Sequence, residues 1–221
     1  MASRRFDRIA ASKPFVFATC LLPLALLVID TVRGTLGPDP VARLEHETGI
    51  WALRLLLVTL AITPLRTLTG WNALVRYRRM LGLFAFFYAT LHFLIYLVVD
   101  LGGFWSQIFA EIAKKPFITV GFLAWLLLVP LAVTSTKGMM RRLGRRWQAL
   151  HRLVYLIGVL AVLHFLWQVK WGETIAALEP VVYAGVFLVL MLARAPAWRA
   201  RRAQQKKTAT RPGVRETPTT N

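Results

Sequence analysis

Long apolar runs, separated by short polar and basic segments, dominate the hydrophobic pattern of this 221-residue chain. A bilayer core of roughly 30 Å needs about 20 apolar residues per helix, and the runs have that length. The pattern predicts an all-α integral membrane bundle of six transmembrane helices, over residues 15–32, 50–68, 80–99, 117–134, 150–169 and 175–193. A basic cytoplasmic N-terminus, 1–14, is expected before this transmembrane domain, 15–198, and a basic disordered cytoplasmic tail, 199–221, after it.

The composition supports an apolar environment for the chain. Hydrophobic residues make up 57% and charged residues only 17%, which is too apolar a balance for an ordinary soluble domain. The net charge of +18 comes from basic residues that interrupt the apolar runs, so it indicates membrane topology and lipid contact and argues against nucleic-acid binding. The single cysteine, Cys20, lies inside the first run and excludes an internal disulfide and a Cys-based metal site.

Basic residues are concentrated in alternate segments between the runs. The N-terminus and the segments 66–79 and 137–146 are rich in Lys and Arg, whereas most of the acidic residues lie in the other connections. By the positive-inside rule, both termini are predicted to be cytoplasmic in a multi-pass protein of the bacterial inner membrane. No internal repeat stands out, so the inverted-repeat signature of many transporters is missing.

Two of the four histidines are expected inside helices at similar depth. His92 is at about the thirteenth position of the third predicted helix and His164 at about the fifteenth of the fifth, and both helices run outward. A buried imidazole needs a partner, and one imidazole on each side of a heme iron is a good solution; a packing or proton-relay histidine is the alternative. The residues that share the face of each histidine are expected to leave room for a macrocycle. They are Gly82, Ala85 and Ala89 on one helix, and Ile157 and Ala161 on the other.

Three further residues are weaker candidates. His151 is expected at the inner end of the fifth helix, about 20 Å from His164 along the helix, where it would hold a second heme or simply lie at the interface. The corresponding position of the third helix is Arg79, so a second ligand is not evident. His46 is predicted in the outer loop between the first two helices. Arg54, an intramembrane charge, is expected to contact a heme propionate or to reach the outer surface.

Several long blocks also resemble a known family, in order and with similar spacing, from about residue 37 to residue 170. They include GPDPVARLEHETG, RRMLGLFAFFYATLH and AVTSTKGMMRRLGRRWQALHRLVYL. The resemblance is to the heme-binding membrane subunit of the periplasmic methionine sulfoxide reductase system, the MsrQ/YedZ family of the ferric reductase-like transmembrane group. It implies axial heme-iron ligands at His92, His164 and His151, with one b-type heme, or two, and FMN as a further cofactor whose binding residues cannot be assigned.

The same resemblance implies an electron-transfer subunit rather than an enzyme. Electrons would come from the quinone pool or from a cytosolic flavin reductase and pass to a periplasmic molybdopterin-containing catalytic subunit that repairs methionine sulfoxide. Relatives that carry their own dehydrogenase add a nucleotide-binding domain, and this sequence has no G-x-G-x-x-G turn after its last apolar run. The alternatives are a proton or ion transporter that uses the buried histidines, a cofactor-free membrane anchor and a stand-alone ferric reductase.

Overall fold

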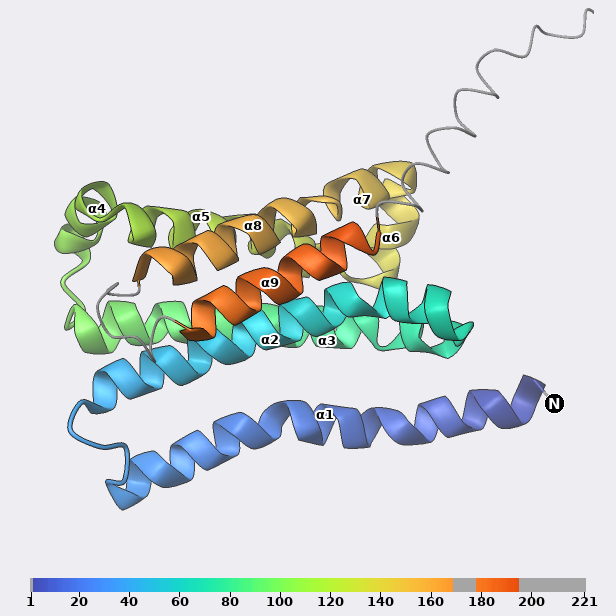
Figure 1. Cartoon of the computed structure of the whole chain (residues 1–221), viewed down its shortest axis with the longest axis horizontal. Coiled ribbons are helices and arrows are strands. Elements are labelled where there is room, and N and C mark those ends of the chain that lie inside the picture. Colours follow the sequence, from blue (N-terminus) through green and yellow to red (C-terminus); the bar gives the residue numbers. More distant parts are fainter. Residues whose placement is uncertain (1, 169–177, 195–221) are drawn as a thin grey trace, which may run out of the picture.

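Long helices that run alternately in opposite directions form the molecule. The computed structural model describes residues 2–168 and 178–194. In this part of the chain the long helices are α1 (Ala2–Arg33), α2 (Pro40–Thr69), α3 (Arg78–Ile95), α5 (Pro116–Val133), α8 (Leu153–Gln168) and α9 (Leu178–Leu192). They lie side by side along one axis (Figure 1). The all-α prediction is confirmed for these residues.

Short helices connect the long ones. The 3-10 helix η1 (Asn72–Arg76) joins α2 to α3, the π-helix η2 (Tyr96–Asp100) extends α3, and α4 (Trp105–Lys114) leads into α5. At the opposite end from α4, α6 (Lys137–Leu143) and α7 (Arg145–Leu150) connect α5 to α8 (Figure 1). The start of α1 and the end of α9 lie at the same end of the bundle as α6 and α7.

Five of the helices in the described ranges are long and apolar enough to cross a membrane, and α9, also apolar, is shorter. Five of the six predicted spans therefore correspond to helices of sufficient length, whereas α9, with 15 residues, is shorter than the sixth predicted span. Residue 169 of the fifth predicted span, residues 175–177 of the sixth, residues 195–198 of the predicted transmembrane domain and the whole predicted tail, 199–221, lie outside the described residues.

Helix α2 begins ten residues earlier than the apolar run predicted, which corrects the expected position of His46. The side chain of Asp39 accepts a hydrogen bond from the backbone N–H of Ala42 at 3.0 Å, and Pro40 occupies the first turn. This capping arrangement starts a helix efficiently. His46 therefore lies on α2 and not in a loop.

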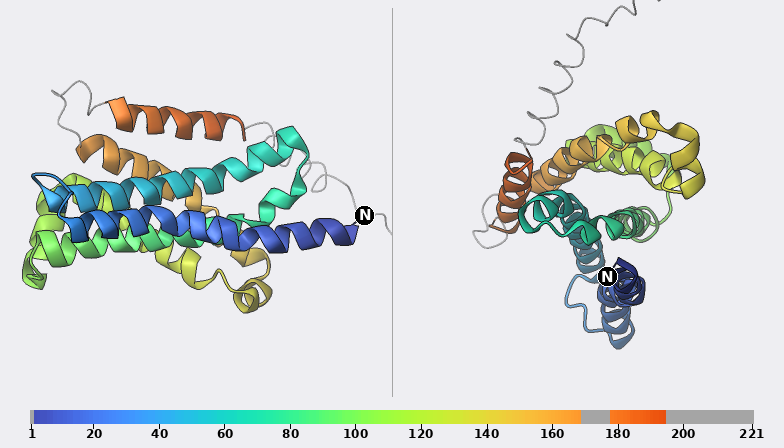
Figure 2. Two further views of the ribbon diagram at one scale, coloured as in Figure 1. Left: turned by 90° about the horizontal axis from the view of Figure 1, so that it is seen from below. Right: turned by 90° about the vertical axis from the view of Figure 1, so that its right-hand side faces the viewer.

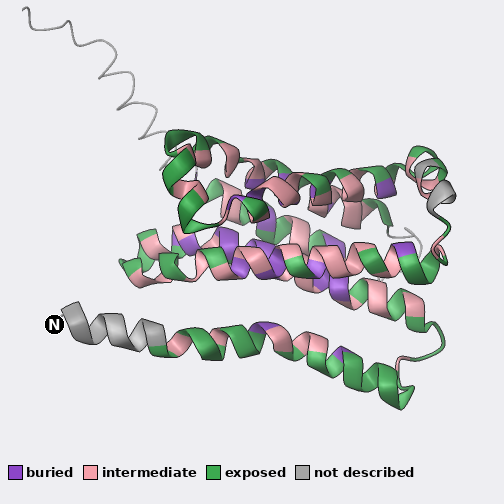
Figure 3. Ribbon diagram, turned by 180° about the vertical axis from the view of Figure 1, so that it is seen from behind, coloured by how far each residue is buried: buried purple, intermediate pink, exposed green. Residues whose placement is uncertain are grey.

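Two helix pairs form the centre of the bundle. Helix α2 packs chiefly on α3, and α5 packs chiefly on α8. Helix α1 lies at one side of the bundle, next to α2 and α3, whereas α9 covers α2 and α8 (Figure 2). Buried residues gather in the central helices, while α1 is mostly exposed (Figure 3). Exposed apolar side chains on α1, such as Phe15 and Val32, are suited to contact with lipid.

A proline in α2 explains how the end of α9 is held. Pro64 has no N–H, so the carbonyl of Leu60, one turn earlier, lacks its helical partner. Arg194 is only 3% exposed and donates from Nη2 to this carbonyl and from Nη1 to the hydroxyl of Tyr155, the latter at 2.8 Å. The guanidinium thus joins the segment after α9 to α2 and α8.

Candidate functional site

A cavity of about 290 Å³ lies between the two central helix pairs. His92 from α3 and His164 from α8 both line it. Seven of the other lining residues have small side chains, which leave space beside the imidazoles: Gly49 and Ala52 on α2, Ala85 and Ala89 on α3, Gly121 and Ala124 on α5, and Ala161 on α8. Of the small residues predicted to share the face of His92, Gly82 is not among the lining residues, because it faces Thr59 of α2.

The structure brings the rings of His92 and His164 together. Their centroids are 6.1 Å apart and their planes are inclined by 75°. A metal–nitrogen bond of about 2.0 Å and about 1.2 Å from nitrogen to ring centroid, counted on both sides, require about 6.4 Å between the centroids. The observed separation therefore suits two imidazoles that bind one metal ion from opposite sides, as in a bis-histidine heme centre.

The hydrogen bonds of the two rings define which nitrogen is free. Nδ1 of His92 lies 2.9 Å from the carbonyl oxygen of Glu45, and Nδ1 of His164 lies 2.7 Å from that of Phe117. A carbonyl oxygen can only accept, so each Nδ1 carries the proton. In a neutral imidazole this leaves the lone pair on Nε2, at the far side of the ring from the helix backbone. Both histidines therefore have the tautomer that a metal centre needs.

Polar groups without partners lie toward the α4 end of the cavity. The Oε1 atom of Glu45 and the hydroxyl of Tyr96 are buried and have no hydrogen-bond partner among the described residues. Leaving such a group unpaired costs about 1–3 kcal/mol, so each requires a polar partner, either water or a ligand, at this end of the cavity. Lys115, which pairs with Glu111, also lines this end. A hydroxyl donor and an ammonium group suit the carboxylates of a heme.

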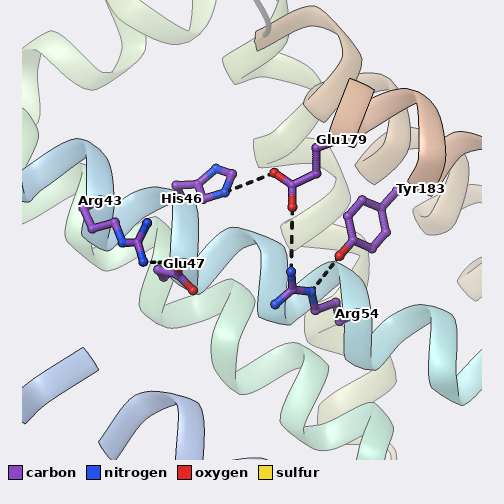
Figure 4. A network of polar contacts seen from close by, with 6 residues as sticks. All are labelled: Arg43, His46, Glu47, Arg54, Glu179 and Tyr183. Atoms are coloured by element: carbon purple, nitrogen blue, oxygen red, sulfur yellow. Dashed lines mark hydrogen bonds and ion pairs between the residues drawn. The ribbon is translucent and has the colours of Figure 1, made fainter. Parts of the chain in front are cut away.

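Arg54 takes part in a network on the side of α2 that faces α9 (Figure 4). Its Nε donates to the hydroxyl of Tyr183 at 2.7 Å, and its Nη2 lies 3.7 Å from Glu179. Nε2 of His46 lies 3.3 Å from the other carboxylate oxygen of Glu179. The intramembrane charge is thus paired with a carboxylate of the protein itself. Among the described residues, His46 lines the cavity and Arg54 does not.

His151 lies away from the other two candidate ligands. Its ring stacks on Trp147 with 3.8 Å between centroids, and its Nδ1 lies 3.1 Å from the carbonyl oxygen of Trp147. Its Nε2 is 3.5 Å from the hydroxyl of Ser135. Arg79, at the corresponding position of α3, lines a different cavity between α1 and α3. The structure therefore places His92 next to His164, and it places His151 next to neither of them.

The structure also reveals a repeat that was not apparent from the sequence. Adding 72 to a residue number relates the site of α2 and α3 to that of α5 and α8. The matched pairs are Glu45 and Phe117, Gly49 and Gly121, Ala89 and Ala161, and His92 and His164. Sequence reasoning missed the two glycines, although the equal separation of 43 residues between glycine and histidine was available as a signal.

A membrane bundle with two adjacent buried imidazoles in a cavity that small residues line in part is typical of heme-binding transmembrane proteins. Comparison with known proteins agrees. Residues 48–162 match a family model described as ferric reductase like transmembrane component. The chain belongs to the MsrQ family of heme-binding subunits within this group, as three relatives show.

All three relatives are named protein-methionine-sulfoxide reductase heme-binding subunit MsrQ. The protein from Xanthomonas axonopodis pv. citri is 59% identical over 189 residues, which cover 83% of this chain and 85% of the relative. That from Xanthomonas oryzae pv. oryzae is 55% identical and covers 91% and 94%, and that from Ralstonia nicotianae is 52% identical and covers 80% and 81%. No solved structure gives a significant match.

Proposed function

We propose that this chain is the b-type heme electron-transfer subunit of a methionine sulfoxide reductase system in the bacterial inner membrane. The observation that carries the proposal is the pair His92 and His164, whose ring centroids lie 6.1 Å apart in a cavity that small residues line in part. His92 and His164 would hold the heme iron through their Nε2 atoms. A bound heme supplies a one-electron carrier inside the low-dielectric core of the bundle.

The chain's own residues set the position and potential of this carrier. The backbone carbonyls of Glu45 and Phe117 orient the two ligand rings and raise their basicity. Tyr96 and Lys115 are proposed to contact the propionates, and Arg54 is the weaker candidate because it is paired with Glu179. His151 is the candidate ligand of a second, inner heme.

The proposed path runs from the cytoplasmic side to the periplasm. Electrons enter from quinol or from a cytosolic flavin reductase, with FMN as a further candidate cofactor, and leave to a periplasmic molybdopterin-containing catalytic subunit that repairs methionine sulfoxide. The proposal includes six membrane spans with α9 as the last, and both termini in the cytoplasm. The clustering of the chain's two described ends with the basic helices α6 and α7 supports this topology. The chain itself is then a carrier, and the substrate chemistry belongs to the partner.

An anaerobic transfer experiment tests this function. The purified chain is mixed with a reduced quinol or with a flavin reductase and NADPH, and the visible spectrum is followed before and after adding the periplasmic subunit with methionine sulfoxide. The expected result is heme reduction by at least one donor and reoxidation that requires both the subunit and its substrate. Reoxidation by ferric chelates alone would favour a stand-alone ferric reductase, and a colourless chain that moves ions across vesicles would favour a transporter.

A further inference from the structure

The two candidate ligands dock on their neighbouring helices in the same way. Each histidine donates Nδ1–H to a backbone carbonyl that lies 47 residues earlier in the chain, Glu45 for His92 and Phe117 for His164. In an α-helix, the carbonyl oxygen of residue i points toward the N–H of residue i+4. An imidazole that shares this oxygen must therefore lie beside residue i+4. In both cases that residue is a glycine, Gly49 on α2 and Gly121 on α5.

A side chain at either glycine would meet the histidine ring. A Cβ atom on Gly121 would lie 2.7 Å from Nδ1 of His164, which is closer than real Cβ contacts. A Cβ atom on Gly49 would lie 3.1 Å from Nδ1 of His92, so the ring would have to move by a few tenths of an ångström. The three nearest atoms to each Cβ position all belong to the imidazole.

This environment differs from that of a packing glycine. Small residues in membrane helices commonly allow two backbones to approach each other. Gly82 on α3 is an example of a looser site, because a Cβ atom there would meet only the Thr59 side chain at 3.8 Å. At Gly49 and Gly121 the neighbour is a functional side chain instead. The arrangement occurs twice, at positions that are 72 residues apart in the sequence. This repetition argues against a chance contact between a glycine and a histidine.

We infer that Gly49 and Gly121 are positioning residues, which keep the space over the carbonyl one turn earlier open for the imidazole that binds heme iron from that side. Each glycine thereby fixes the ring plane and the tautomer of one axial ligand. The two planes are held by different helices and stay inclined by 75°. This inference rests on the proposed heme function and extends it to residues that touch neither the iron nor the electron donor.

Alanine substitutions provide a graded test. Gly121→Ala, Gly49→Ala and the control Gly82→Ala are purified, and each is measured for heme affinity, midpoint potential and the low-spin electron paramagnetic resonance signal of the oxidised state. That signal depends on the relative orientation of the ligand planes. Gly121→Ala should lower heme affinity by about 10–100-fold, the range for losing a ligand-orienting group, and shift the resonance signal. Gly49→Ala should do so less, and Gly82→Ala should match the parent chain.

The midpoint potential of the bound heme is a further readout, because a general loss of protein stability would not shift it. Losing the hydrogen bond to the carbonyl makes the imidazole less basic and stabilises ferric iron less, so the midpoint potential should rise in the heme that remains. The helical content and melting temperature of the heme-free chains control for folding. If Gly121→Ala does not fold, Gly49→Ala, with its smaller displacement, carries the test alone.

The outcomes separate this inference from the proposed function. A parent chain without heme contradicts the proposed function and this inference with it. A parent chain that holds heme, together with Gly121→Ala and Gly49→Ala variants indistinguishable from Gly82→Ala in affinity, potential and resonance signal, contradicts the positioning role alone.

Discussion

The rings of His92 and His164 lie 6.1 Å apart between centroids, although each belongs to a different helix pair. Burying two imidazoles in a membrane protein is costly unless their nitrogens have partners. The Nδ1 atoms have backbone carbonyls as partners, and the Nε2 atoms are left for a ligand. This is the relationship on which the proposed redox role depends.

Removal of either ligand should remove most of the heme. His92→Ala and His164→Ala are expected to lower heme content at least tenfold, because the remaining imidazole holds the iron from one side only. His151→Ala should lower or alter heme binding only if the inner site is occupied. Heme quantitation of the three purified variants checks this, and a full complement in both His92→Ala and His164→Ala would refute the assignment.

The propionate contacts can be assigned by comparing two cations. Lys115→Gln should lower the midpoint potential, because a positive charge that disfavours ferric iron is lost from the cavity end. Arg54→Gln should change it less, because Arg54 is paired with Glu179 and Tyr183 outside the cavity wall. Redox titration of both variants makes the comparison. A larger shift for Arg54→Gln would assign the propionate contact to Arg54.

Tyr88 should control how firmly α1 is attached. Its hydroxyl donates to the carbonyl of Cys20 at 2.8 Å and accepts from the backbone N–H of Leu24 at 3.2 Å. Tyr88→Phe should weaken the packing of α1 on α3 by about 1 kcal/mol. The population in which α1 has separated from α3 should then rise roughly fivefold. Cys20, the only cysteine and a buried one, reports it by maleimide labelling. Tyr183→Phe is the control, and equal labelling rates in the two variants would oppose the prediction.

Arg194 should be a stability determinant despite its position after the end of α9. Arg194→Gln removes the guanidinium that donates to the Leu60 carbonyl, at a cost of about 1–3 kcal/mol. The melting temperature should fall by roughly 2–10 °C. The exposed Arg152, changed to Gln, is the matched control and should melt like the parent chain.

A second substitution tests the reason for this effect. Pro64→Ala restores an N–H to the Leu60 carbonyl, so it should recover part of the stability lost in Arg194→Gln. Purely additive melting temperatures would show that the Leu60 contact is not the source of the stabilisation.

The apolar runs were sufficient to predict an all-α bundle and to place His92 and His164 at matching depth, because run length and helix direction fix depth in a membrane. They could not predict that α2 begins at Pro40, since its first turns are polar and are recognised by the Asp39 cap rather than by hydrophobicity. His46 was consequently assigned to a loop.

Contacts between segments that are distant in the sequence could not be predicted either. The docking of His164 beside Gly121 joins residues 43 apart, and the burial of Arg194 depends on a carbonyl that Pro64 leaves free. Neither relation produces a local pattern of apolar and polar residues. Arg194 therefore did not stand out among the basic residues that follow the sixth predicted span.

The most direct test of the account is a dithionite-reduced minus oxidised visible spectrum of the purified chain, followed by pyridine hemochrome quantitation. The account predicts sharp b-type bands and about one heme per chain, and a ratio near two would add the His151 site. A featureless spectrum from well-folded protein, expressed with heme supplied, would contradict the redox role of His92 and His164.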